Sequence, residues 1–518
     1  MTITTSIFSK IKPFWPIIGL LLFSLITRLI YVQNYDIPFT FDHGKDSLAV
    51  IHMLEIKDIK LIGPWTSIPG LYFGPAWYYL LGLGYLATGY DPMGGIYTMI
   101  LLTLVQTFFL YKYISKTAAV LSVTTPFWLT LSTSAWNPLP MTLLTIMIYF
   151  LLIKTKSKKS LSFKTAFFLG LTAAFGFHFS SAFAIFYPLI IISYLFLNKV
   201  KLKLSSILIF IIGFVLPFAP QAIFELKHNF VQTRAVIEYF AVQHPEEQLA
   251  GQPFQIFSSF IDFVKLSSLP FWSLTQTIWA TLAGAIMIVW ITKKRQLFGK
   301  LKNDLLLASL FCVFPLIGYQ FLHFNVWYLY ALAPVFTILV GKLLDAGVSK
   351  RFLWVIFGIY LLASCQNLFA YLVKYQPEHM QNRVFLPVKL TAIQTIRDLA
   401  GAQPYTVYTF VPHIYDYSYQ YIYFWQAKQG VPLPVEFSYQ PGEISYVQQK
   451  PELLANFANQ ISDQPAELIF LIIEKENNTP NDWWYNQWRG SLPKYEELET
   501  KDIGGIKIIK GQLLNTSD

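Results

Sequence analysis

Long apolar segments alternate with short polar loops through roughly the first 375 residues of the chain. Crossing the hydrocarbon core of a bilayer takes roughly 20 consecutive apolar residues in a helix. Segments that approach this length lie at about 13–32, 71–89, 95–112, 117–134, 139–153, 165–197, 204–224, 271–292, 304–322, 326–344 and 352–373. The segment 165–197 is long enough for a hairpin of two short helices, broken near FGFHFSSA. The pattern predicts a polytopic α-helical membrane protein with about 11–13 transmembrane helices.

Lysine-rich loops set the expected orientation of these helices. The loops 154–164, 198–203 and 293–302 are basic, and the positive-inside rule places such loops in the cytoplasm. The N-terminus is then expected in the cytoplasm, and everything after about residue 375 on the outer side. The stretch 71–116 leaves two alternatives open: either one apolar segment only dips into the membrane, or its lysines break the rule. We favour a dip of the segment 71–89, which contains proline and glycine.

The pattern changes in kind after residue 375. Charges of both signs are interspersed there, and the apolar runs are short. Residues 391–401 predict an amphipathic helix that ends at glycine, and 405–411, 467–474 and 506–510 predict short strands. We therefore expect two domains: a multi-helix transmembrane domain over 1–375 and a small extracytoplasmic α/β domain over 376–518, on the outer face of the membrane.

Composition narrows the protein class. Hydrophobic residues make up 54% of the chain and charged residues only 13%, about half the usual globular share. The net charge of +10 falls largely in the short loops, and no basic face carries interleaved aromatics, so nucleic acid is not an expected partner. The chain has only two cysteines, Cys312 and Cys365, both inside apolar segments, and this number is too small for a disulfide framework or a zinc quartet.

A cluster of charges follows the first apolar segment, in FTFDHGKDS at 39–47. If this stretch is helical, Asp42 and Asp46 share one face and Lys45 lies beside them. Such a group could take a proton from an acceptor hydroxyl or amine while the lysine binds a phosphate. It could equally be a solvated loop held by a local ion pair, and spacing alone leaves both interpretations open.

Other polar residues gather at outer helix ends and outer loops. They are Asn137, His178, Glu225, His228, Arg234 and His323. Each could be structural, and a lone histidine at a helix end more often is. Few ionisable residues lie at mid-membrane depth, where a transporter keeps its binding residues. Their distribution favours an active site in an outward-facing cavity at the membrane surface.

These residues belong to short motifs whose order resembles a known family. The motifs are, in chain order, the acidic stretch Asp42–Asp46, GPAWYYL at 74–80, WNP at 136–138, His178, PFAPQAIFELKHNFVQTRAV at 217–236 and WYLYALAP at 327–334. Together they resemble the GT-C superfamily of membrane glycosyltransferases, in particular the family 39 / RgtA-B-C-D-like group related to protein O-mannosyltransferases and aminoarabinose transferases. The chain departs from that group where Lys45 replaces the commoner arginine, and in the pair His43-Gly44.

The resemblance implies a hexosyl- or pentosyltransferase of the plasma membrane, surrounded by membrane lipids. Its donor would be a polyprenyl-phosphate-linked sugar, and its acceptor a hydroxyl or amine of a lipid, protein or glycan on the outer face. Asp42 would be the base, supported by Asp46, and the donor phosphate would bind Lys45, His178 and Arg234. The other residues expected to line the substrate cavity are Asn137, Glu225, His228 and His323.

Some relatives need a divalent metal and others do not. The nearby carboxylates could hold one ion with help from a phosphate, but no all-protein metal site is visible, and no cofactor is otherwise expected. Two other classes stay open on the sequence: a transporter or flippase of lipid-linked saccharides, and an envelope polysaccharide polymerase or ligase.

Overall fold

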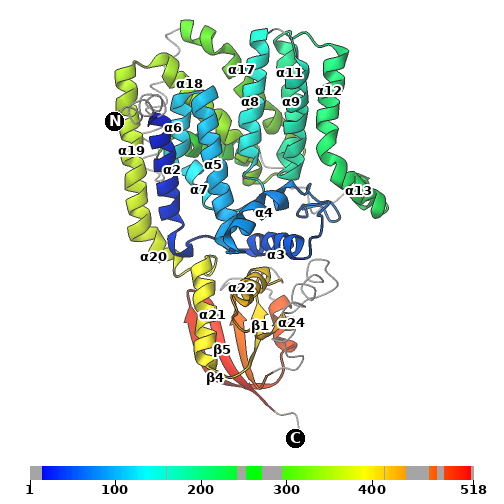
Figure 1. Cartoon of the computed structure of the whole chain (residues 1–518), viewed down its shortest axis with the longest axis vertical. Coiled ribbons are helices and arrows are strands. Elements are labelled where there is room, and N and C mark those ends of the chain that lie inside the picture. The colour runs from blue at the N-terminus through cyan, green and yellow to red at the C-terminus, as the bar shows by residue number, and fades with distance from the viewer. Residues whose placement is uncertain are drawn as a thin grey trace, which may run out of the picture. The chain divides into compact units, whose positions relative to one another are not determined.

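The computed structural model describes residues 15–158, 160–241, 253–270, 295–412, 415–438, 466–474 and 483–514. The chain forms two compact units (Figure 1). The first unit comprises Met1–Ile30, Lys60–Leu80 and Thr98–Phe369, and the second comprises Tyr31–Ile59, Leu81–Tyr97 and Ala370–Asp518. From the sequence we expected a division near residue 375. The last segment of the second unit begins at Ala370, and two early segments, 31–59 and 81–97, belong to the same unit.

The first unit is a helix bundle. Its longer helices are α2 (Trp15–Tyr31), α5 (Met93–Tyr113), α6 (Lys116–Thr124), α7 (Pro126–Ser132), α8 (Met141–Lys158), α9 (Phe163–Phe175), α11 (Phe186–Leu197), α12 (Leu204–Val215), α13 (Ala219–Lys227), α14 (Val231–Ala241), α15 (Pro253–Ser268), α17 (Arg295–Gly318), α18 (Ala333–Gly347) and α19 (Lys350–Ala370). Short turns of helix connect some of them: η3 (Gly176–His178), α10 (Ser181–Ala184), η4 (Leu216–Phe218) and η6 (Val326–Leu332). The expected hairpin over 165–197 is confirmed, with its break at η3 and α10.

Several of these helices can cross a membrane. Among the described residues, five are long and apolar enough: Met93–Tyr113, Leu204–Lys227, Gly299–Gly318, Val326–Gly347 and Lys350–His379. Three shorter apolar helices are Trp15–Tyr31, Met141–Thr155 and Ser181–Leu197. The predicted segment 271–292 lies outside the described residues. The chain is a multi-pass membrane protein.

The segment expected to dip forms a short helix, α4 (Ala76–Thr88), of 13 residues. At about 1.5 Å per residue it is roughly 20 Å long, which is less than the ~30 Å of a hydrocarbon core. Among the described residues, α4 is not one of the five helices that are long and apolar enough to cross a membrane. The dip itself stays a prediction.

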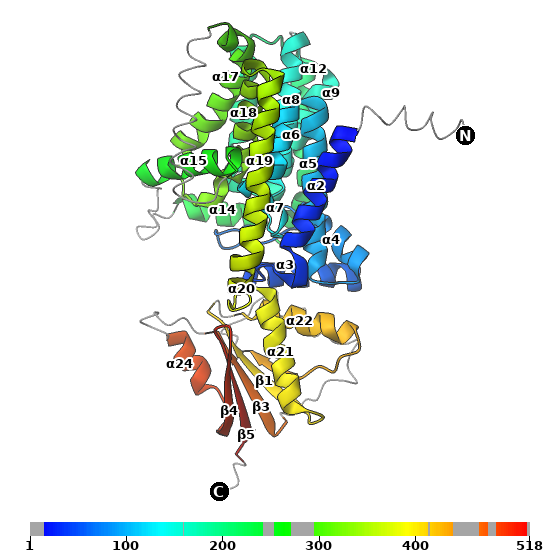
Figure 2. The same cartoon turned by 90° about the vertical axis from the view of Figure 1, so that its left-hand side faces the viewer.

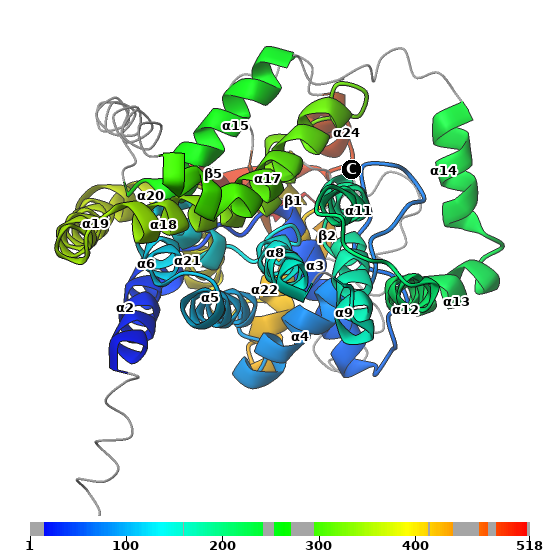
Figure 3. The ribbon, with the colours of Figure 1, turned by 90° about the horizontal axis from the view of Figure 1, so that it is seen from above.

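Small residues let helices of the bundle approach closely. α9 and α12 lie side by side (Figures 1 and 3). A Cβ atom on Gly170 would lie 2.1 Å from the carbonyl oxygen of Phe210, and one on Gly213 would lie 2.3 Å from that of Phe167. Glycine is therefore required on both sides of this contact, as is common where transmembrane helices pack.

The second unit contains a five-stranded sheet of order β2-β1-β3-β5-β4. The strands are β1 (Tyr405–Phe410), β2 (Val435–Ser438), β3 (Leu468–Ile473), β4 (Tyr495–Ile503) and β5 (Ile506–Leu513). β1 pairs in parallel with β2 and β3, and β5 pairs antiparallel with β3 and β4. The three predicted strands are confirmed as β1, β3 and β5.

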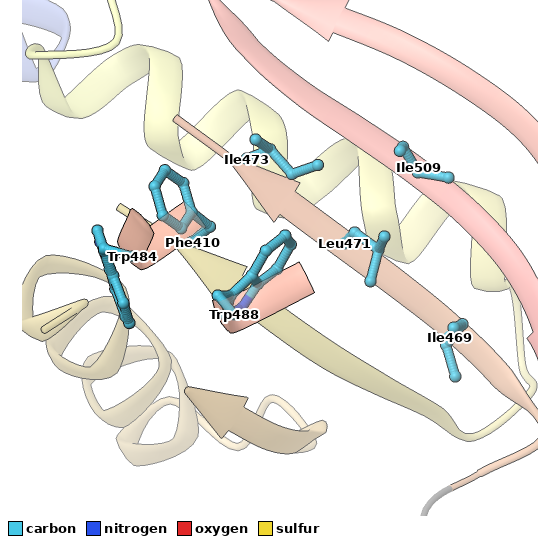
Figure 4. Packing of buried hydrophobic residues seen from close by; sticks show 7 residues of the cluster. All are labelled: Phe410, Ile469, Leu471, Ile473, Trp484, Trp488 and Ile509. Carbon is cyan, nitrogen blue, oxygen red and sulfur yellow. The ribbon is translucent and has the colours of Figure 1, made fainter. Parts of the chain in front are cut away.

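Helices cover both faces of this sheet. α21 (Leu386–Ala400) and α24 (Trp483–Gly490) lie on opposite sides (Figure 2). The core on the α24 side is aromatic and aliphatic (Figure 4), and its residues are Phe410, Ile469, Leu471, Ile473, Trp484, Trp488 and Ile509. α21 is the predicted amphipathic helix, and Gly401 ends it with a φ of 62°, where glycine is favoured. The sheet is an α/β domain, as predicted.

The two early segments of the second unit pack against α22 (Tyr417–Lys428). They form η2 (Gln33–Tyr35), α3 (Phe41–Glu55) and the end of α4. A Cβ atom on Gly44 would lie 2.4 Å from the backbone nitrogen of Ser418, so α3 touches the α22 backbone at a point where only glycine fits. Lys428 pairs with Glu55 at 2.9 Å. These contacts explain why the charged stretch after the first helix belongs to the same unit as the tail.

Candidate active site

The charged stretch forms the first turns of helix α3. Thr40 precedes the helix with an extended backbone and serves as its N-cap. Its N–H donates to His43 Nδ1 over 3.3 Å, and its Oγ1 lies 2.9 Å from the same nitrogen. This reciprocal capping starts the helix at Phe41. Asp42 therefore lies in the first helical turn, where the helix dipole favours a negative charge.

Lys45 lies between the two carboxylates. Its Nζ donates to Asp42 Oδ1 over 3.0 Å and is 4.0 Å from Asp46 Oδ1. The side chains of Lys45 and Asp46 are 3% and 4% exposed, whereas that of Asp42 is 44% exposed. Buried charges are costly unless paired, so Lys45 and the carboxylates stabilise one another. Asp42 is the member of the group that reaches solvent.

The buried side of α3 is held by hydroxyl and aromatic contacts. Ser47 Oγ lies 2.6 Å from the hydroxyl of Tyr85, whose ring meets that of Tyr421 edge-on with centroids 6.0 Å apart. Phe41 packs on Tyr417 at 5.1 Å. α22 thus fixes the rotation of α3, and with it the direction of Asp42.

The pair that departs from the family pattern, His43-Gly44, has a structural explanation. His43 caps the helix, and Gly44 admits the α22 backbone. Burial lowers the pKa of His43 to about 4, with a smaller opposing effect from Asp42. The imidazole is therefore neutral near pH 7, and it acts as a cap.

His178 is a buried residue of the first unit. The N–H of Ala76 donates to its Nδ1 over 3.3 Å, and a Cβ atom on Gly74 would lie 2.2 Å from the same nitrogen. Burial lowers the pKa of this imidazole to about 4, partly offset by a hydrogen bond to the backbone of Pro217. Two motifs of the sequence, GPAWYYL and the histidine, thus meet in space. These contacts support a structural role for His178.

Asn137 is held in a similar way. Its Nδ2 donates to the carbonyl of Phe179 over 2.7 Å, which ties the WNP turn to the turn that bears His178. The preceding Trp136 packs on Trp327, with ring centroids 5.6 Å apart, and on Tyr330 at 6.0 Å. Motifs far apart in the sequence therefore form one packed group in the first unit.

Glu225 caps helix α14. It accepts from the N–H of Gln232 over 3.0 Å, from the N–H of Thr233 over 2.9 Å and from Thr233 Oγ1 over 2.6 Å. His228 stacks on Phe224 at 4.0 Å, and its Nδ1 lies 2.9 Å from the Phe224 carbonyl. Glu225 therefore fixes the turn between α13 and α14, whereas His228 lies exposed on its surface.

The last two expected residues also lie in the first unit. Arg234 is exposed on α14. Nε2 of His323 lies 3.0 Å from Nδ2 of Asn325, at the start of η6. Of the residues expected to bind the donor phosphate, Arg234 is the cation on the surface, whereas Lys45 is buried and His178 is neutral.

Several charges in the apolar helices were not singled out from the sequence. Arg28 is buried, and its guanidinium donates to the carbonyls of Ser24 and Ser122, each over 3.2 Å. Asp304 lies 2.5 Å from Lys342 Nζ and 2.5 Å from the hydroxyl of Tyr149. The only sequence signal was a charge inside an apolar segment. Because each charge is bonded to protein groups, these residues brace the bundle.

The described side chains do not form a metal site. Within the residues that the structure describes, no group of three or more His, Cys, Asp or Glu side chains could hold an ion. On α3, the ammonium of Lys45 already lies between the two carboxylates.

Comparison with known proteins identifies the fold. No protein-family model matches the sequence, and no curated protein matches it. Two crystal structures of ArnT from Cupriavidus metallidurans do match in structure. The one bound to undecaprenyl phosphate is 11% identical with a TM-score of 0.54, covering 95% of this chain and 97% of that one. The apo form is 10% identical with a TM-score of 0.56, covering 96% and 98%. The chain therefore has the ArnT fold over nearly its whole length, which confirms the fold that its motifs led us to expect.

Proposed function

We propose that this protein is a membrane glycosyltransferase. It moves a sugar from a polyprenyl-phosphate-linked donor to an acceptor hydroxyl or amine on the outer face of the plasma membrane. The observation that carries the proposal is the half-exposed carboxylate of Asp42, held by Lys45 in the first turn of α3. The likeness to ArnT, one of whose structures is bound to undecaprenyl phosphate, supports the class of donor.

Asp42 acts as the base. It takes the proton from the acceptor as the acceptor oxygen or nitrogen forms a bond to the anomeric carbon. The bond from that carbon to the lipid phosphate breaks, and the polyprenyl phosphate leaves with the electron pair. The carboxylate of Asp42 thus accepts the proton, and a cationic side chain elsewhere must stabilise the leaving phosphate.

Lys45 and Asp46 hold Asp42 in place. Lys45 is buried and already donates to Asp42, so we assign it to orienting the base and not to binding phosphate. Asp46, buried beside it, balances the remaining charge of the ammonium. Arg234 is exposed on α14, and its expected binding of the donor phosphate stays a prediction.

The orientation follows from the lysine loops. The N-terminus lies in the cytoplasm and the α/β domain on the outer side, where the acceptor is found. A transporter is the main alternative. The buried charges of Arg28 and Asp304, and the partly buried Lys342, are bonded to protein groups, which favours the transferase.

The experiment compares purified protein variants in lipid vesicles. The substrate is a polyprenyl-phosphate sugar with a radiolabelled sugar, and the measured quantity is label transferred to an envelope acceptor extract. Asp42→Asn should lower transfer by about 10²–10⁴-fold. The matched control is Asp262→Asn, because Asp262 also pairs with a lysine three residues on, Lys265, at 3.4 Å. Transfer by Asp42→Asn at the wild-type rate would overturn the assignment.

A further inference from the structure

Asp36 is a buried acid that the proposed reaction does not use. It lies between α2 and α3, six residues before Asp42, and its side chain is 0% exposed. Its carboxylate accepts from the hydroxyl of Tyr371 and lies 3.0 Å from His379 Nδ1. The three residues come from two chain segments that are more than 300 positions apart, both within the second unit.

The partners of Asp36 are themselves fixed. The hydroxyl of Tyr371 is also 2.6 Å from the carbonyl of Tyr31, and the two rings lie 4.3 Å apart. Tyr371 begins a π-helical turn, Tyr371–Tyr375, an irregularity often found at functional sites. His379 stacks on Phe385 at 3.8 Å with nearly parallel rings.

Main-chain bonds join the same two segments. The N–H of Phe39 donates to the carbonyl of Val384 over 2.8 Å, and the N–H of Leu386 donates to that of Ile37 over 2.9 Å. Pro38 and Phe385 form an antiparallel bridge between them. This short ladder ends at Phe39, directly before the Thr40 cap of α3.

We propose that Asp36, Tyr371 and His379 form a clasp that positions the catalytic helix. The clasp fixes the chain that enters α3, and it thereby sets the place of Asp42 relative to the bound acceptor. Its catalytic part rests on the proposed function. A misplacement of about 1 Å at a reacting group can cost about 10²-fold in rate, so a loosened clasp should act on kcat.

The carboxylate is what makes this cluster a clasp. A buried carboxylate that loses a hydrogen-bond donor is strongly destabilised. The arrangement in which both Tyr371 and His379 donate to Asp36 is therefore favoured. The paired state of the two segments is thereby favoured over one in which their main-chain bonds open.

The test uses full-length variants with two readouts. Tyr371→Phe and His379→Leu each remove one donor to Asp36. Hydrogen exchange of amides 41–47 should quicken at least about tenfold, while amides of β3 stay protected. kcat for transfer should fall about 10-fold or more, with the donor KM within about threefold of wild type.

Two controls separate positioning from general damage. Tyr375→Phe changes an exposed tyrosine one helical turn from Tyr371, and should match wild type in both readouts. His379→Asn keeps an N–H donor close to the position of Nδ1, and should restore slow exchange and most of kcat. Unchanged exchange at 41–47 in both donor-removal variants would overturn the clasp.

The outcomes also distinguish the two proposals. If the wild type shows no transfer, the proposed function fails, whereas exchange still decides whether the clasp holds α3. If exchange quickens and kcat stays at the wild-type value, the clasp does not position the catalytic residue and the inference fails.

Discussion

On helix α3 charged side chains bond to one another, whereas in the turns of the first unit polar side chains bond to the main chain. Lys45 donates to Asp42, which remains 44% exposed. His178 accepts from the N–H of Ala76, Asn137 donates to the carbonyl of Phe179, and Glu225 accepts from two amides of α14.

The difference separates two roles for polar residues. A side chain that completes a buried main-chain hydrogen bond is committed, because breaking that bond leaves an unsatisfied group at about 1–3 kcal/mol. A carboxylate held by one side chain and open to solvent keeps an oxygen available for substrate. Changes that move or remove the charged group of α3 should therefore act on rate, and changes that break the main-chain bonds of the turns should act on stability.

Among changes that leave Asp42 in place, the largest effect is expected where α3 meets α22. Gly44→Ala places a Cβ atom 2.4 Å from the Ser418 nitrogen, so α3 must move away and carry Asp42 with it. We expect transfer to fall about 10–100-fold. Gly358→Ala is the matched control, because a Cβ atom on this helical glycine meets nothing within 4 Å. A variant Gly44→Ala with full activity would break the link between α22 and the base.

The second effect concerns the turns. His178→Ala leaves the Ala76 N–H without its acceptor, and should lower the free energy of unfolding by about 1–3 kcal/mol. The control is His228→Ala, at an exposed histidine, with a cost within about 0.5 kcal/mol. Thermal unfolding of detergent-solubilised protein measures both. A collapse of kcat in His178→Ala without lost stability would assign this histidine to the chemistry instead.

A smaller effect is a dependence of stability on pH. Burial holds the pKa of His43 near 4, below the ordinary value of 6.5, so the unfolded chain binds the proton more readily. The stability from this cap is fully present above pH 6.5 and is lost as pH falls toward 4. His43→Gln keeps the capping-box pattern without the titration, and should flatten the profile of thermal midpoint against pH in this window. An identical profile would argue against a neutral His43 cap.

The smallest effect should come from chelation. Lys45 already supplies a positive charge between Asp42 and Asp46, so EDTA should change the rate of transfer less than about twofold. A loss that Mg²⁺ or Mn²⁺ restores would show that a metal contributes.

Much of the fold could be predicted from periodicity. The apolar segments, the strands β1, β3 and β5, and the end of α21 at Gly401 followed from local patterns. α22 was missed because nearly all of it is buried, so it shows no amphipathic period. The edge strand β4 was missed because its charged side chains are largely exposed.

The site was predictable only in part. Asp42, Lys45 and Asp46 could be singled out by charge and spacing. The sequence could not show that Gly44 meets Ser418, or that Asp36 meets Tyr371, since these contacts join distant segments. The sequence also could not show that His178 and Asn137 bond to the main chain and not to a substrate. Every residue has main-chain groups, so no sequence pattern marks such a partner.

The central claim is that Asp42 is the base and not a ligand of the donor. A single-turnover measurement tests it most directly, with Asp42→Asn in vesicles, saturating labelled polyprenyl-phosphate sugar, and donor Kd determined separately. We predict a donor Kd within about threefold of wild type and a rate of sugar transfer lower by about 10²–10⁴-fold. A wild-type rate of transfer, or a rate loss explained wholly by weaker donor binding, would contradict the account.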